Sequence, residues 1–477
     1  MKKKLVWFRN DLRIHDNTAL YHACQYSIDQ VFALFMSTPK QWLNHSVSIK
    51  KISFIYQNLL YLQNELNNLN IPFYHLQSTD FKQSIYDLNF FCIKHKINYI
   101  FYNYQYEINE YNRDVFIKKY FLEQKIIVQG FHDNILIPTK FIYTKNNKPY
   151  KKFSSFKKKA IEILCNNIPK CFPTPIKRIL LKYHLFNHTE FKKYKINFNI
   201  NLFPPGEKAA QNRLEDFFNN KIHDYTIKRN FPFLNHTSIL SPYLSIGIIS
   251  LRYCLNILSK RYDNIFNITF LSSWLNEIIW REFYYHLLIG YPLLGKLQSV
   301  NSWEKNIIWD NNINYFHAWT QGKTGFPIID ASMRQLKDIG WIHNRLRMIT
   351  SNFLVKNLLI DWRKGEKYFM SQLIDGDFAL NNGGWQWASS IGSDATPYIR
   401  IFNPYRQSKK FDKSGHFIRQ FIPELKYIPD AHIHNPHTWE DINKITLDYP
   451  KPIVDFHENR KKTLLVFKQA KYKFIFK

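Results

Sequence analysis

The sequence is poor in cysteine and contains only Cys24, Cys92, Cys165, Cys171 and Cys254. Their number is odd, their spacing is wide, and no Cys-x-x-Cys pair occurs. A disulfide framework needs paired cysteines, and a structural zinc site needs closely spaced thiolates. Neither is indicated, no metal site is expected, and we interpret the cysteines as buried thiols in a reducing compartment.

Long hydrophobic runs are also missing. No stretch approaches the roughly 18 consecutive apolar residues that a membrane span needs. The basic start Met1-Lys2-Lys3-Lys4 is followed by an apolar run that ends at Arg9, which is shorter than the roughly 7–15 apolar residues of a secretory signal. We therefore expect the mature protein to begin at Met1, to stay in the cytoplasm and to have no membrane partner.

A third missing feature is the Gly-x-Gly-x-x-Gly motif of dinucleotide-binding domains. After the first predicted strand the chain reads Arg9-Asn10-Asp11-Leu12-Arg13. No glycine in this turn would let the backbone approach a pyrophosphate. The pattern disfavours an NAD-dependent enzyme.

Negative charge is scarce as well, because 66 basic residues stand against 37 acidic ones and leave a net charge of +29. Such a balance favours a polyanionic partner such as nucleic acid. Lys, Asn, Ile, Phe and Tyr are all abundant, however, and an AT-rich genome would produce the same bias. The charge alone leaves both interpretations open.

Short apolar runs alternate with helical stretches in the first part of the chain. This alternation predicts an α/β N-terminal domain with a parallel, Rossmann-like sheet over residues 1–137. A helix over residues 19–26 would be capped by Asp16 or Asn17. The predicted strands cover residues 5–8, 31–35, 98–102 and 126–128.

Residues 138–205 are basic, irregular and contain several prolines, which predicts a long connector with one short helix at residues 156–165. From residue 206 to residue 477 apolar residues recur at helical spacing, and strand signals are nearly absent. This part is predicted to be a larger all-helical domain. Its predicted helices cover residues 211–219, 244–259, 269–289, 329–336, 344–359 and 368–373.

Nine of the twelve tryptophans fall between residues 274 and 387. Any one of them alone suits a hydrophobic core. Trp274, Glu277 and Arg281, however, are spaced three and four residues apart and would share one helix face, with Trp280 beside them. A carboxylate between two indoles is costly to bury alone, and it is favourable where a ligand presents hydrogen-bond donors.

A second segment places Trp341, Asn344, Arg345 and Met348 on one predicted helix face. An amide, a guanidinium and a thioether beside an indole suit a flat and partly polar ring. A polar network between helices would use the same residues.

Residues 375–387 contain two acids, Asp375 and Asp377, together with two glycines and two tryptophans. This composition does not fit an amphipathic core helix. The glycines permit close backbone approach, and the acids are able to accept hydrogen bonds from ring N–H or ribose groups.

Residues 237–244 offer three aliphatic hydroxyls, from Thr237, Ser238 and Ser241, at a predicted helix start. Backbone N–H groups at a helix start favour phosphate binding. Capping of the helix by Ser241 is the alternative interpretation, and the two roles are compatible.

From Leu5-Val-Trp-Phe-Arg-Asn-Asp-Leu-Arg13 to Thr446-Leu-Asp-Tyr-Pro-Lys-Pro-Ile-Val454, the chain resembles the photolyase/cryptochrome family, and most closely its bacterial dimer photolyases with a folate antenna. The resemblance rests on Trp-x-x-Glu-x-x-Trp-Arg-Glu, Trp-x-His-Asn-Arg-x-Arg-Met and Asp-Gly-Asp…Asn-Asn-Gly-Gly-Trp-Gln-Trp. It implies a monomeric enzyme that uses light to repair cyclobutane pyrimidine dimers in double-stranded DNA.

The resemblance also implies one reduced FAD per chain, folded into a U shape in the helical domain. The residues that match the flavin site of the family are Tyr225, Thr237, Ser238, Leu240, Ser241, Trp274, Arg281, Asn344, Arg347, Asp375, Asp377 and Asn381. Many relatives have a basic residue where this chain has Ile239, so one contact near the phosphates is expected to differ.

Further site residues follow from the same match. The lesion cavity would be lined by Glu277, Trp280, Asn344, Met348 and Trp387, and an electron would pass along Trp385, Trp362 and Trp309. Arg229, Arg281, Arg345 and Arg400 are expected at the DNA contact, although ordinary ion pairs would explain each of them equally well.

In folate-type relatives the residues that match His45, Asn109 and Glu110 contact a methenyltetrahydrofolate antenna. A carboxylate that accepts two pterin N–H donors is chemically reasonable. Some relatives use a deazaflavin or no antenna.

Three alternatives remain at this point. A cryptochrome would share the fold and the flavin but would signal instead of repairing DNA, and the complete lesion-cavity set favours repair. A (6–4) photoproduct enzyme would be expected to carry a histidine pair, and only His343 lies nearby. A non-enzymatic basic nucleic-acid-binding protein would carry no chromophore. An enzyme that binds DNA is expected to be associated with the nucleoid.

Overall fold

The computed structural model describes residues 2–26, 28–179, 195–393 and 399–475. Contacts divide the chain into two compact units. The first unit contains residues 1–223, 238–296 and 374–377, and the second unit contains residues 224–237, 297–373 and 378–477. The domain boundaries predicted at residues 137 and 205 stay a prediction. Residues 180–194 of the predicted connector lie outside the described residues.

The first unit contains a five-stranded sheet of order β3-β2-β1-β4-β5, in which every strand pairs in parallel with its neighbour. The predicted parallel α/β fold is confirmed, and four strands lie where the apolar runs indicate. Strand β3 was not predicted, because its five residues Phe-Tyr-His-Leu-Gln mix apolar and polar side chains. The strands are β1 (Lys3–Phe8), β2 (Gln30–Ser37), β3 (Phe73–Gln77), β4 (Tyr99–Asn103) and β5 (Ile127–Phe131).

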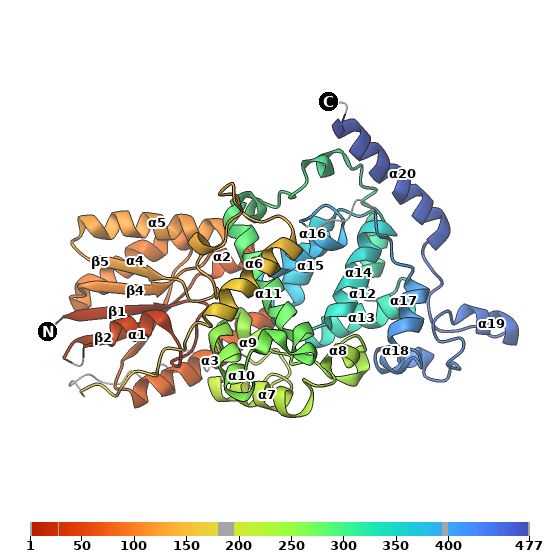
Figure 1. The fold of residues 1–477 in the computed structure, drawn as a ribbon. Coiled ribbons are helices and arrows are strands. Elements are labelled where there is room, and N and C mark those ends of the chain that lie inside the picture. Colours follow the sequence, from red (N-terminus) through yellow and green to blue (C-terminus); the bar gives the residue numbers. More distant parts are fainter. Residues whose placement is uncertain (1, 27, 180–194, 394–398, 476–477) are drawn as a thin grey trace. The chain divides into compact units, whose positions relative to one another are not determined.

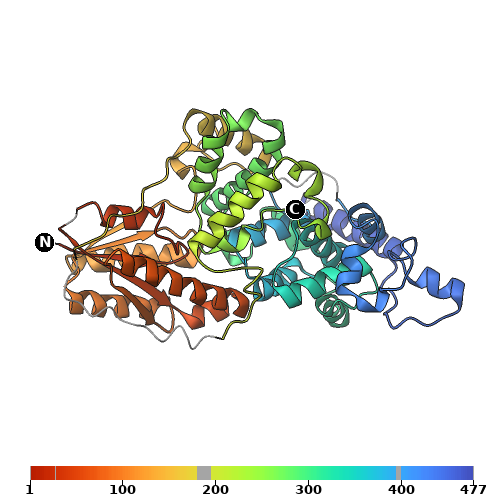
Figure 2. The same cartoon turned by 90° about the horizontal axis from the view of Figure 1, so that it is seen from below.

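Helices cover both faces of this sheet. Figure 1 shows α4 and α5 on one face and α1 and α3 on the other, and Figure 2 gives the view from the side of α1 and α3. Leu5 and Trp7 of β1 point towards the face of α4 and α5 and join its hydrophobic core. The side chain of Asn17 accepts from the backbone N–H of Leu20, so Asn17 is the cap of the first helix. These helices are α1 (Thr18–Ala23), α2 (Pro39–Asn44), α3 (Ile49–Asn68), α4 (Phe81–His95) and α5 (Ile108–Glu123).

The rest of the first unit is mainly helical. The single helix predicted over residues 244–259 is wrong, because the chain forms two helices there with Gly247 between them. Gly247 has a φ of +67°, and a Cβ at this position would lie 2.2 Å from the backbone oxygen of Asn10, so only glycine fits. The helices are α6 (Phe153–Asn166), α7 (Glu207–Asn220), α9 (Ser241–Ser245), α10 (Leu251–Arg261) and α11 (Thr269–Gly290).

The second unit is helical throughout its regular elements. Helix α16 contains two adjacent glycines of the segment 375–387, and tertiary packing outweighs the roughly 1 kcal/mol that each glycine costs in a helix. The helices are α8 (Tyr225–Lys228), α12 (Ile313–Gln321), α13 (Pro327–Ile339), α14 (Asn344–Lys356), α15 (Trp362–Gln372), α16 (Phe378–Ala388), α17 (Pro404–Phe411), α18 (His416–Phe421), α19 (His437–Asn443) and α20 (Phe456–Ile475).

Short 3₁₀ helices connect several of these elements. They are η1 (Thr139–Phe141), η4 (Ile265–Asn267) and η5 (Pro292–Lys296) in the first unit, and η3 (Pro232–Leu234), η6 (Ser302–Asn306) and η7 (Pro423–Leu425) in the second.

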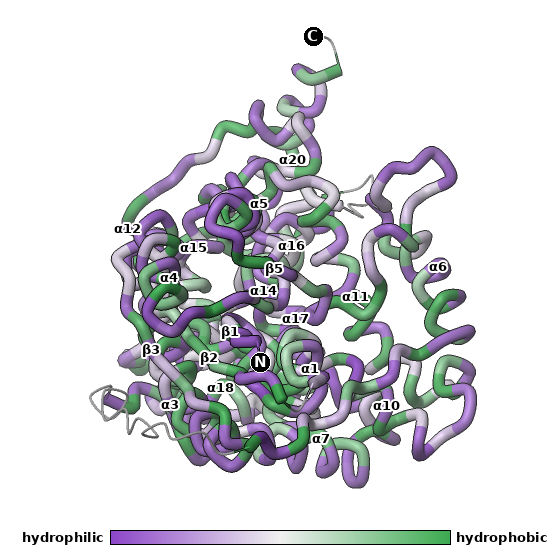
Figure 3. The backbone as a smooth tube through the Cα atoms, turned by 90° about the vertical axis from the view of Figure 1, so that its left-hand side faces the viewer, coloured by the Kyte–Doolittle hydropathy of each residue, from purple (hydrophilic) through white to green (hydrophobic). Residues whose placement is uncertain are grey.

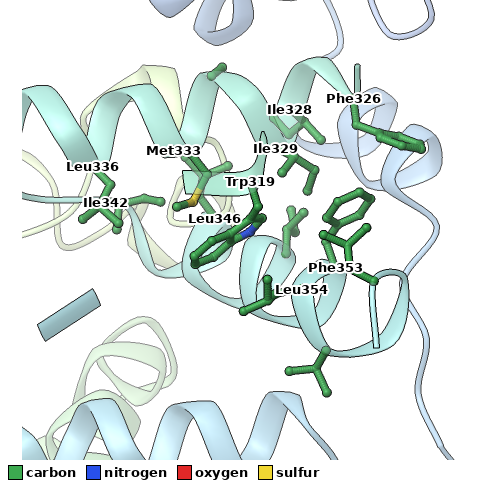
Figure 4. Packing of buried hydrophobic residues seen from close by; sticks show 14 of the residues in the cluster. Trp319, Phe326, Ile328, Ile329, Met333, Leu336, Ile342, Leu346, Phe353 and Leu354 are labelled. Atoms are coloured by element: carbon green, nitrogen blue, oxygen red, sulfur yellow. The ribbon is translucent and has the colours of Figure 1, made fainter. Parts of the chain in front are cut away.

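Aromatic and aliphatic side chains fill the core of the second unit. Figure 4 shows Trp319 of α12 among residues of α13 and α14, including Met333 and Leu354. Its indole nitrogen donates to the backbone oxygen of Thr350 at 3.2 Å, which satisfies the one polar atom of this buried ring. A Cβ on Gly365 of α15 would lie 2.2 Å from the Trp385 ring, so this glycine allows α15 and α16 to pack closely.

Figure 3 shows short hydrophobic and hydrophilic stretches interspersed along the backbone. Within the described residues, no helix combines the length and the apolar character that crossing a bilayer requires. The cysteines follow the sequence interpretation only in part, because Cys24, Cys92 and Cys254 are buried, whereas Cys165 is exposed and Cys171 is half-buried.

Candidate active site

Helix α11 carries the first group of predicted site residues on the spacing that the sequence indicated. Trp274 and Arg281 are buried, whereas Glu277 and Trp280 are only half-buried. The Trp274 ring packs against Phe218 of α7 with 5.1 Å between the ring centroids. Glu277 and Trp280 are thus the more exposed members of this group, and they lie about one helical turn apart.

The indole of Trp280 is stacked on Phe153, the first residue of α6, with 3.6 Å between centroids and 5° between ring planes. Phe283 and Tyr284 also contact the indole, at 5.7 Å and 5.5 Å. Because Phe153 covers one face, an incoming ring is able to stack only on the opposite face. Sequence reasoning missed Phe153, since a single phenylalanine in a lysine-rich stretch has no distinguishing pattern.

Arg281 begins a partly buried chain of hydrogen bonds in the first unit. Its two terminal nitrogens donate to the backbone and side-chain oxygens of Asn134 at 2.9 Å and 2.6 Å. The Asn134 amide donates to the Tyr285 oxygen at 3.0 Å, and the Tyr285 hydroxyl donates to Asp377 at 2.6 Å. Burial and the neighbouring Asp377 raise the pKa of Tyr285 well above its usual value, so the phenol keeps its proton. This buried position disfavours the DNA contact predicted for Arg281.

Asp375 and Asp377 belong to the short segment 374–377, which packs with the first unit. Both carboxyl groups are buried. The backbone oxygen of Gly376 between them accepts a 2.6 Å hydrogen bond from the Lys51 ammonium. Sequence reasoning missed Lys51, which lies 325 positions away along the chain.

In the second unit, helix α14 begins at Asn344 and has His343 as its cap, whose Nδ1 accepts from the backbone N–H of Arg345 at 3.0 Å. Trp341 precedes the helix, so the predicted helix face that includes Trp341 is wrong. Burial and the nearby Arg345 lower the pKa of His343 to about 4, so this imidazole is neutral at pH 7.

The other residues predicted on α14 have different surroundings. Asn344 is exposed, and Met348 and Arg347 are half-buried. The guanidinium of Arg345 lies over the Phe411 ring at 4.6 Å and donates to the Met348 sulfur at 3.7 Å. Arg347 donates from Nε to the backbone oxygen of residue 342 at 2.9 Å. These contacts orient both arginines within the second unit.

One side of α16 carries both Asn381 and Gly384, three residues apart. The Asn381 amide donates to the backbone oxygen of Glu366 at 3.0 Å. Apart from its two chain neighbours and the backbone of its own helix, no described atom lies within 4 Å of the place where a Gly384 Cβ would be. Burial raises the pKa of Glu366 to about 7, and its Oε1 has no hydrogen-bond partner in the described part of the chain. A fixed amide, a buried acid and open space at a glycine fit the polar edge of a flat ring such as a flavin.

The three tryptophans of the predicted electron chain lie in the second unit and differ in burial. Trp385 and Trp362 are buried, and Trp309 is half-buried beside Phe467 of α20, with 6.1 Å between ring centroids. Trp319, which the sequence did not single out for this chain, lies 6.1 Å from Trp385. Exposure therefore increases from Trp385 and Trp362 to Trp309, as an electron path from the surface requires. Trp387 is half-buried on the same helix as Trp385.

The residues predicted at the phosphate end of the flavin are divided between the units. Tyr225 and Thr237 belong to the second unit, and Ser238, Leu240 and Ser241 belong to the first. Ser241 is the first residue of α9 and Leu240 is the cap, so the interpretation of Ser241 as a helix cap is wrong.

Ile239, within the same stretch, is buried and has a φ of +48°. A β-branched residue rarely adopts this conformation, which costs on the order of 1–3 kcal/mol. Such strain persists where the surrounding structure enforces a particular backbone path, and it marks this loop as a functional candidate.

The predicted DNA contacts Arg229 and Arg400 both lie in the second unit. The Arg229 guanidinium is 5.2 Å from the centre of the Tyr225 ring. Arg400 is exposed, and its backbone oxygen accepts from the Lys356 ammonium at 2.9 Å. An exposed guanidinium on an anchored backbone suits a phosphate contact.

His45, Asn109 and Glu110, the predicted antenna residues, lie together in the first unit. The Asn109 amide is 3.0 Å from His45 Nε2, and Glu110 Oε1 is 3.8 Å from His45 Nδ1. Lys296, which the sequence did not single out, donates to Asn109 Oδ1 at 3.0 Å. Glu110 is buried, and its Oε2 has no hydrogen-bond partner within the described ranges, so it is able to accept from the N–H groups of a pterin.

Comparison with known families gives two matches. A family model described as DNA photolyase matches residues 4–175, and one described as FAD binding domain of DNA photolyase matches residues 274–469.

Comparison with known proteins extends these matches over the whole chain. The deoxyribodipyrimidine photo-lyase of Buchnera aphidicola subsp. Acyrthosiphon pisum is 57% identical over 474 residues, which are 99% of this chain and 98% of that protein. The deoxyribodipyrimidine photo-lyase of Escherichia coli is 43% identical over 471 residues, which are 99% of each chain.

Solved structures agree in fold. A class III photolyase from Agrobacterium tumefaciens aligns with a TM-score of 0.87 and 30% identity over 99% of this chain and 98% of the other. A cryptochrome from Synechocystis aligns with a TM-score of 0.87 and 28% identity over 98% of this chain and 99% of the other.

Proposed function

Because the chain belongs to the DNA photolyase family, we propose that it is a light-dependent enzyme that splits cyclobutane pyrimidine dimers in DNA. The observation that carries this proposal is the half-buried pair of Glu277 and Trp280 on α11, with Phe153 behind the indole. A pyrimidine that stacks on the face of Trp280 opposite Phe153 would lie beside a carboxyl group able to form a hydrogen bond with it.

FAD is the cofactor, and the C-terminal part of the chain carries the family's FAD-binding domain. When it is bound in its reduced form, FAD supplies the photoexcited electron that opens the cyclobutane ring. The open space at Gly384 beside Asn381 supports a flavin ring at α16. We assign its binding to the residues that match the flavin site of the family, which are Tyr225, Thr237, Ser238, Leu240, Ser241, Trp274, Arg281, Asn344, Arg347, Asp375, Asp377 and Asn381.

The lesion has to leave the duplex before its bonds become accessible, and photolyases are among the enzymes that flip their target out of the helix. A dimer is poorly stacked and poorly paired, so its extrusion costs less than that of intact bases. Trp280 and Trp387 would stack on the flipped rings. A hydrogen bond from the Glu277 carboxyl to a dimer carbonyl would stabilise the negative charge that develops there, and Asn344 and Met348 would position the rings.

Trp385, Trp362 and Trp309 would relay an electron from the surface when the cofactor has become oxidised. The increase in exposure towards Trp309 supports this direction. The relay restores the active redox state and takes no part in the repair step itself.

The cluster of His45, Asn109 and Glu110 would hold a methenyltetrahydrofolate antenna. Its support is the buried carboxylate oxygen that has no protein partner among the described residues. Lys296 would add a positive charge next to Asn109.

Double-stranded DNA with pyrimidine dimers is the partner, and the net charge of +29 supports it. Arg229, Arg345 and Arg400 would contact phosphates, which fixes the register without reading the sequence. Binding should weaken steeply with salt through counterion release. We further propose that the enzyme acts as a monomer and associates with the nucleoid through this binding.

The direct test is a repair assay. Purified protein with reduced FAD is mixed with dimer-containing DNA, and the dimers are counted after illumination and after an equal time in the dark. Loss of dimers only in the light supports the proposal. A flavin spectrum without repair would favour the cryptochrome alternative, and a colourless protein that still binds DNA would favour a non-enzymatic role.

A further inference from the structure

Lys51 occupies an unusual position in the first unit. It is the third residue of α3 (Ile49–Asn68), and only 8% of its surface is exposed. Its backbone N–H donates to the Ser48 hydroxyl that caps the helix, at 3.0 Å. Its ammonium reaches Gly376, whose backbone oxygen accepts at 2.6 Å.

A buried positive charge is unfavourable at this end of a helix. The N-terminus of a helix carries partial positive charge, which favours acids and disfavours lysine. An ammonium also loses its hydration on burial unless opposite charge replaces it. A buried lysine at a helix N-terminus therefore has to be stabilised by other parts of the fold. Residues that are locally unfavourable in this way are concentrated at functional sites.

Three carboxyl groups lie near the Lys51 ammonium, and all of them belong to the first unit. Burial lowers the pKa of Lys51, while Asp377, Glu107 and Asp375 act in the opposite direction and favour the charged ammonium. Burial, with Glu110 and Asp377 nearby, raises the pKa of Glu107 to about 8. Asp375 and Asp377 are thus the acids whose charge Lys51 offsets most directly.

The contact between Lys51 and Gly376 anchors the segment 374–377. This segment packs with the first unit, although the residues on either side of it in the sequence belong to the second. Among the side chains of the first unit that hold it, Lys51 donates to the Gly376 backbone oxygen and the Tyr285 hydroxyl donates to the Asp377 carboxylate, both at 2.6 Å. Of these two side chains, Lys51 is positively charged and Tyr285 is neutral.

We propose that Lys51 is a positioning residue of the flavin site, which anchors the Asp375–Asp377 segment and offsets its negative charge so that reduced FAD is favoured. The inference rests on the proposed roles of Asp375 and Asp377 beside the flavin ring. FAD gains negative charge when it is reduced, so two nearby carboxylates disfavour reduction and a cation among them favours it. Helix α3 of the sheet-containing unit therefore tunes the redox chemistry of the cofactor.

The test uses the full chain loaded with FAD and kept in the dark. Lys51→Met removes the charge at nearly constant length, Lys51→Arg keeps it, and Tyr285→Phe removes the uncharged anchor. Lys40→Met is the matched control, because Lys40 is an exposed lysine of the neighbouring helix α2 with a surface ion pair to Asp80. FAD affinity is measured by fluorescence titration, and the midpoint potential is measured by spectroelectrochemical titration.

We expect Lys51→Met to bind FAD roughly tenfold more weakly, as for the loss of a charged hydrogen bond, and to have a more negative midpoint potential. Lys51→Arg should keep most of both properties. Tyr285→Phe should weaken FAD binding but change the potential less than Lys51→Met does. Lys40→Met should match the wild type in both measurements.

An unchanged potential in Lys51→Met would overturn the electrostatic part of the proposal, and unchanged FAD affinity would overturn the anchoring part. If Lys51→Met does not fold, Lys51→Gln, which keeps a hydrogen-bond donor without charge, replaces it with the same expected shift of potential. None of these measurements uses DNA. Failure of the repair function would therefore appear only in the dimer assay, whereas failure of this inference would appear in the potential.

Discussion

Buried charge is accommodated in different ways around Asp133 of the first unit and around Lys356 and Glu366 of the second. In the first unit Asp133 accepts from both Arg13 and Arg252 at 2.7 Å, and Arg252 also contacts Asp16 at 3.0 Å. Although burial favours the neutral acid, the two arginines hold the pKa of Asp133 well below its usual range. These charges are matched within one network.

The second unit contains two buried groups that have no opposite charge beside them in the part of the chain that the structure describes. Burial, with Arg400 and Lys471 nearby, lowers the pKa of Lys356 to about 7, and burial raises the pKa of Glu366 to about 7. Charges that are paired with opposite charges, as around Asp133, hold elements of a fold in place. Buried groups without an opposite charge, such as Lys356 and Glu366, change protonation near neutral pH. The first arrangement suits a scaffold, and the second suits a region that responds to its surroundings.

The largest effect is expected from breaking the matched network. Arg252→Met leaves Asp133 and Asp16 buried without one of their partners, which should lower the free energy of unfolding by about 3–5 kcal/mol. Urea unfolding followed by circular dichroism measures this change. Arg261→Met on the same helix, where the arginine is exposed, should change it by no more than about 0.5 kcal/mol. Equal effects of the two substitutions would contradict the distinction between matched and surface charge.

A pH-dependent effect should follow from Glu366. The folded protein keeps the Glu366 proton up to about pH 7, whereas the unfolded chain loses it near the ordinary value of 4.5. Stability therefore falls as pH rises between these values, by about 3 kcal/mol for this group alone. Glu366→Gln should remove that fall, so its stability relative to the wild type should increase from pH 5 to pH 7.

Unfolding of both proteins across this pH range provides the measurement. Glu458→Gln, at an exposed position of α20, is the control and should follow the wild type at every pH. A difference between Glu366→Gln and the wild type that does not change with pH would show that Glu366 ionises at an ordinary pKa.

The sequence predicted those parts of the fold in which local pattern and burial agree. The apolar runs of β1 and β2 identified the parallel sheet, and the three-and-four spacing of Trp274, Glu277 and Arg281 identified a face of α11. Strand β3 was missed because it is short and mixed in polarity. Helix α16 was missed because its glycines lower its helix propensity, and its packing against α15 through Gly365 is not visible in the local sequence.

The site was predicted less completely, because several of its contacts join distant parts of the chain. Phe153 and Trp280 are far apart in sequence, and neither reveals the stacked pair. Lys51 lies among ordinary residues at the start of a helix, and only the folded chain brings it to Gly376. The motifs identified candidate catalytic and binding residues. The structure adds the residues that hold these side chains in place, such as Phe153 and Lys51.

Electron relay through the second unit gives the next prediction. Trp385→Phe should lower the rate of flavin photoreduction at least tenfold, because phenylalanine is much harder to oxidise than tryptophan, and should spare repair when the flavin starts reduced. Absorption spectra during illumination with a reductant follow the photoreduction. Trp303→Phe, at a half-buried tryptophan outside the predicted relay, should leave it unchanged. Loss of repair with prereduced flavin in Trp385→Phe would indicate a structural role instead.

The smallest effect concerns the first unit and the orientation of Trp280. Phe153→Leu removes one aromatic stack, worth about 0.5–1.5 kcal/mol, so binding of dimer-containing DNA should weaken severalfold. Binding of undamaged DNA should not change, because phosphate contacts dominate it. Fluorescence anisotropy with both DNAs measures the difference, and Phe141→Leu, at an exposed phenylalanine, is the control. Equal weakening for both DNAs would contradict a role specific to the lesion.

The central claim is that α11 presents a carboxyl group and an indole to a flipped dimer. The repair quantum yield of Glu277→Gln with prereduced flavin, at saturating dimer DNA, tests it most directly. We expect a yield clearly below that of the wild type while the FAD content stays the same, because the side chain acts on the dimer and not on the cofactor. An undiminished yield would contradict the claim.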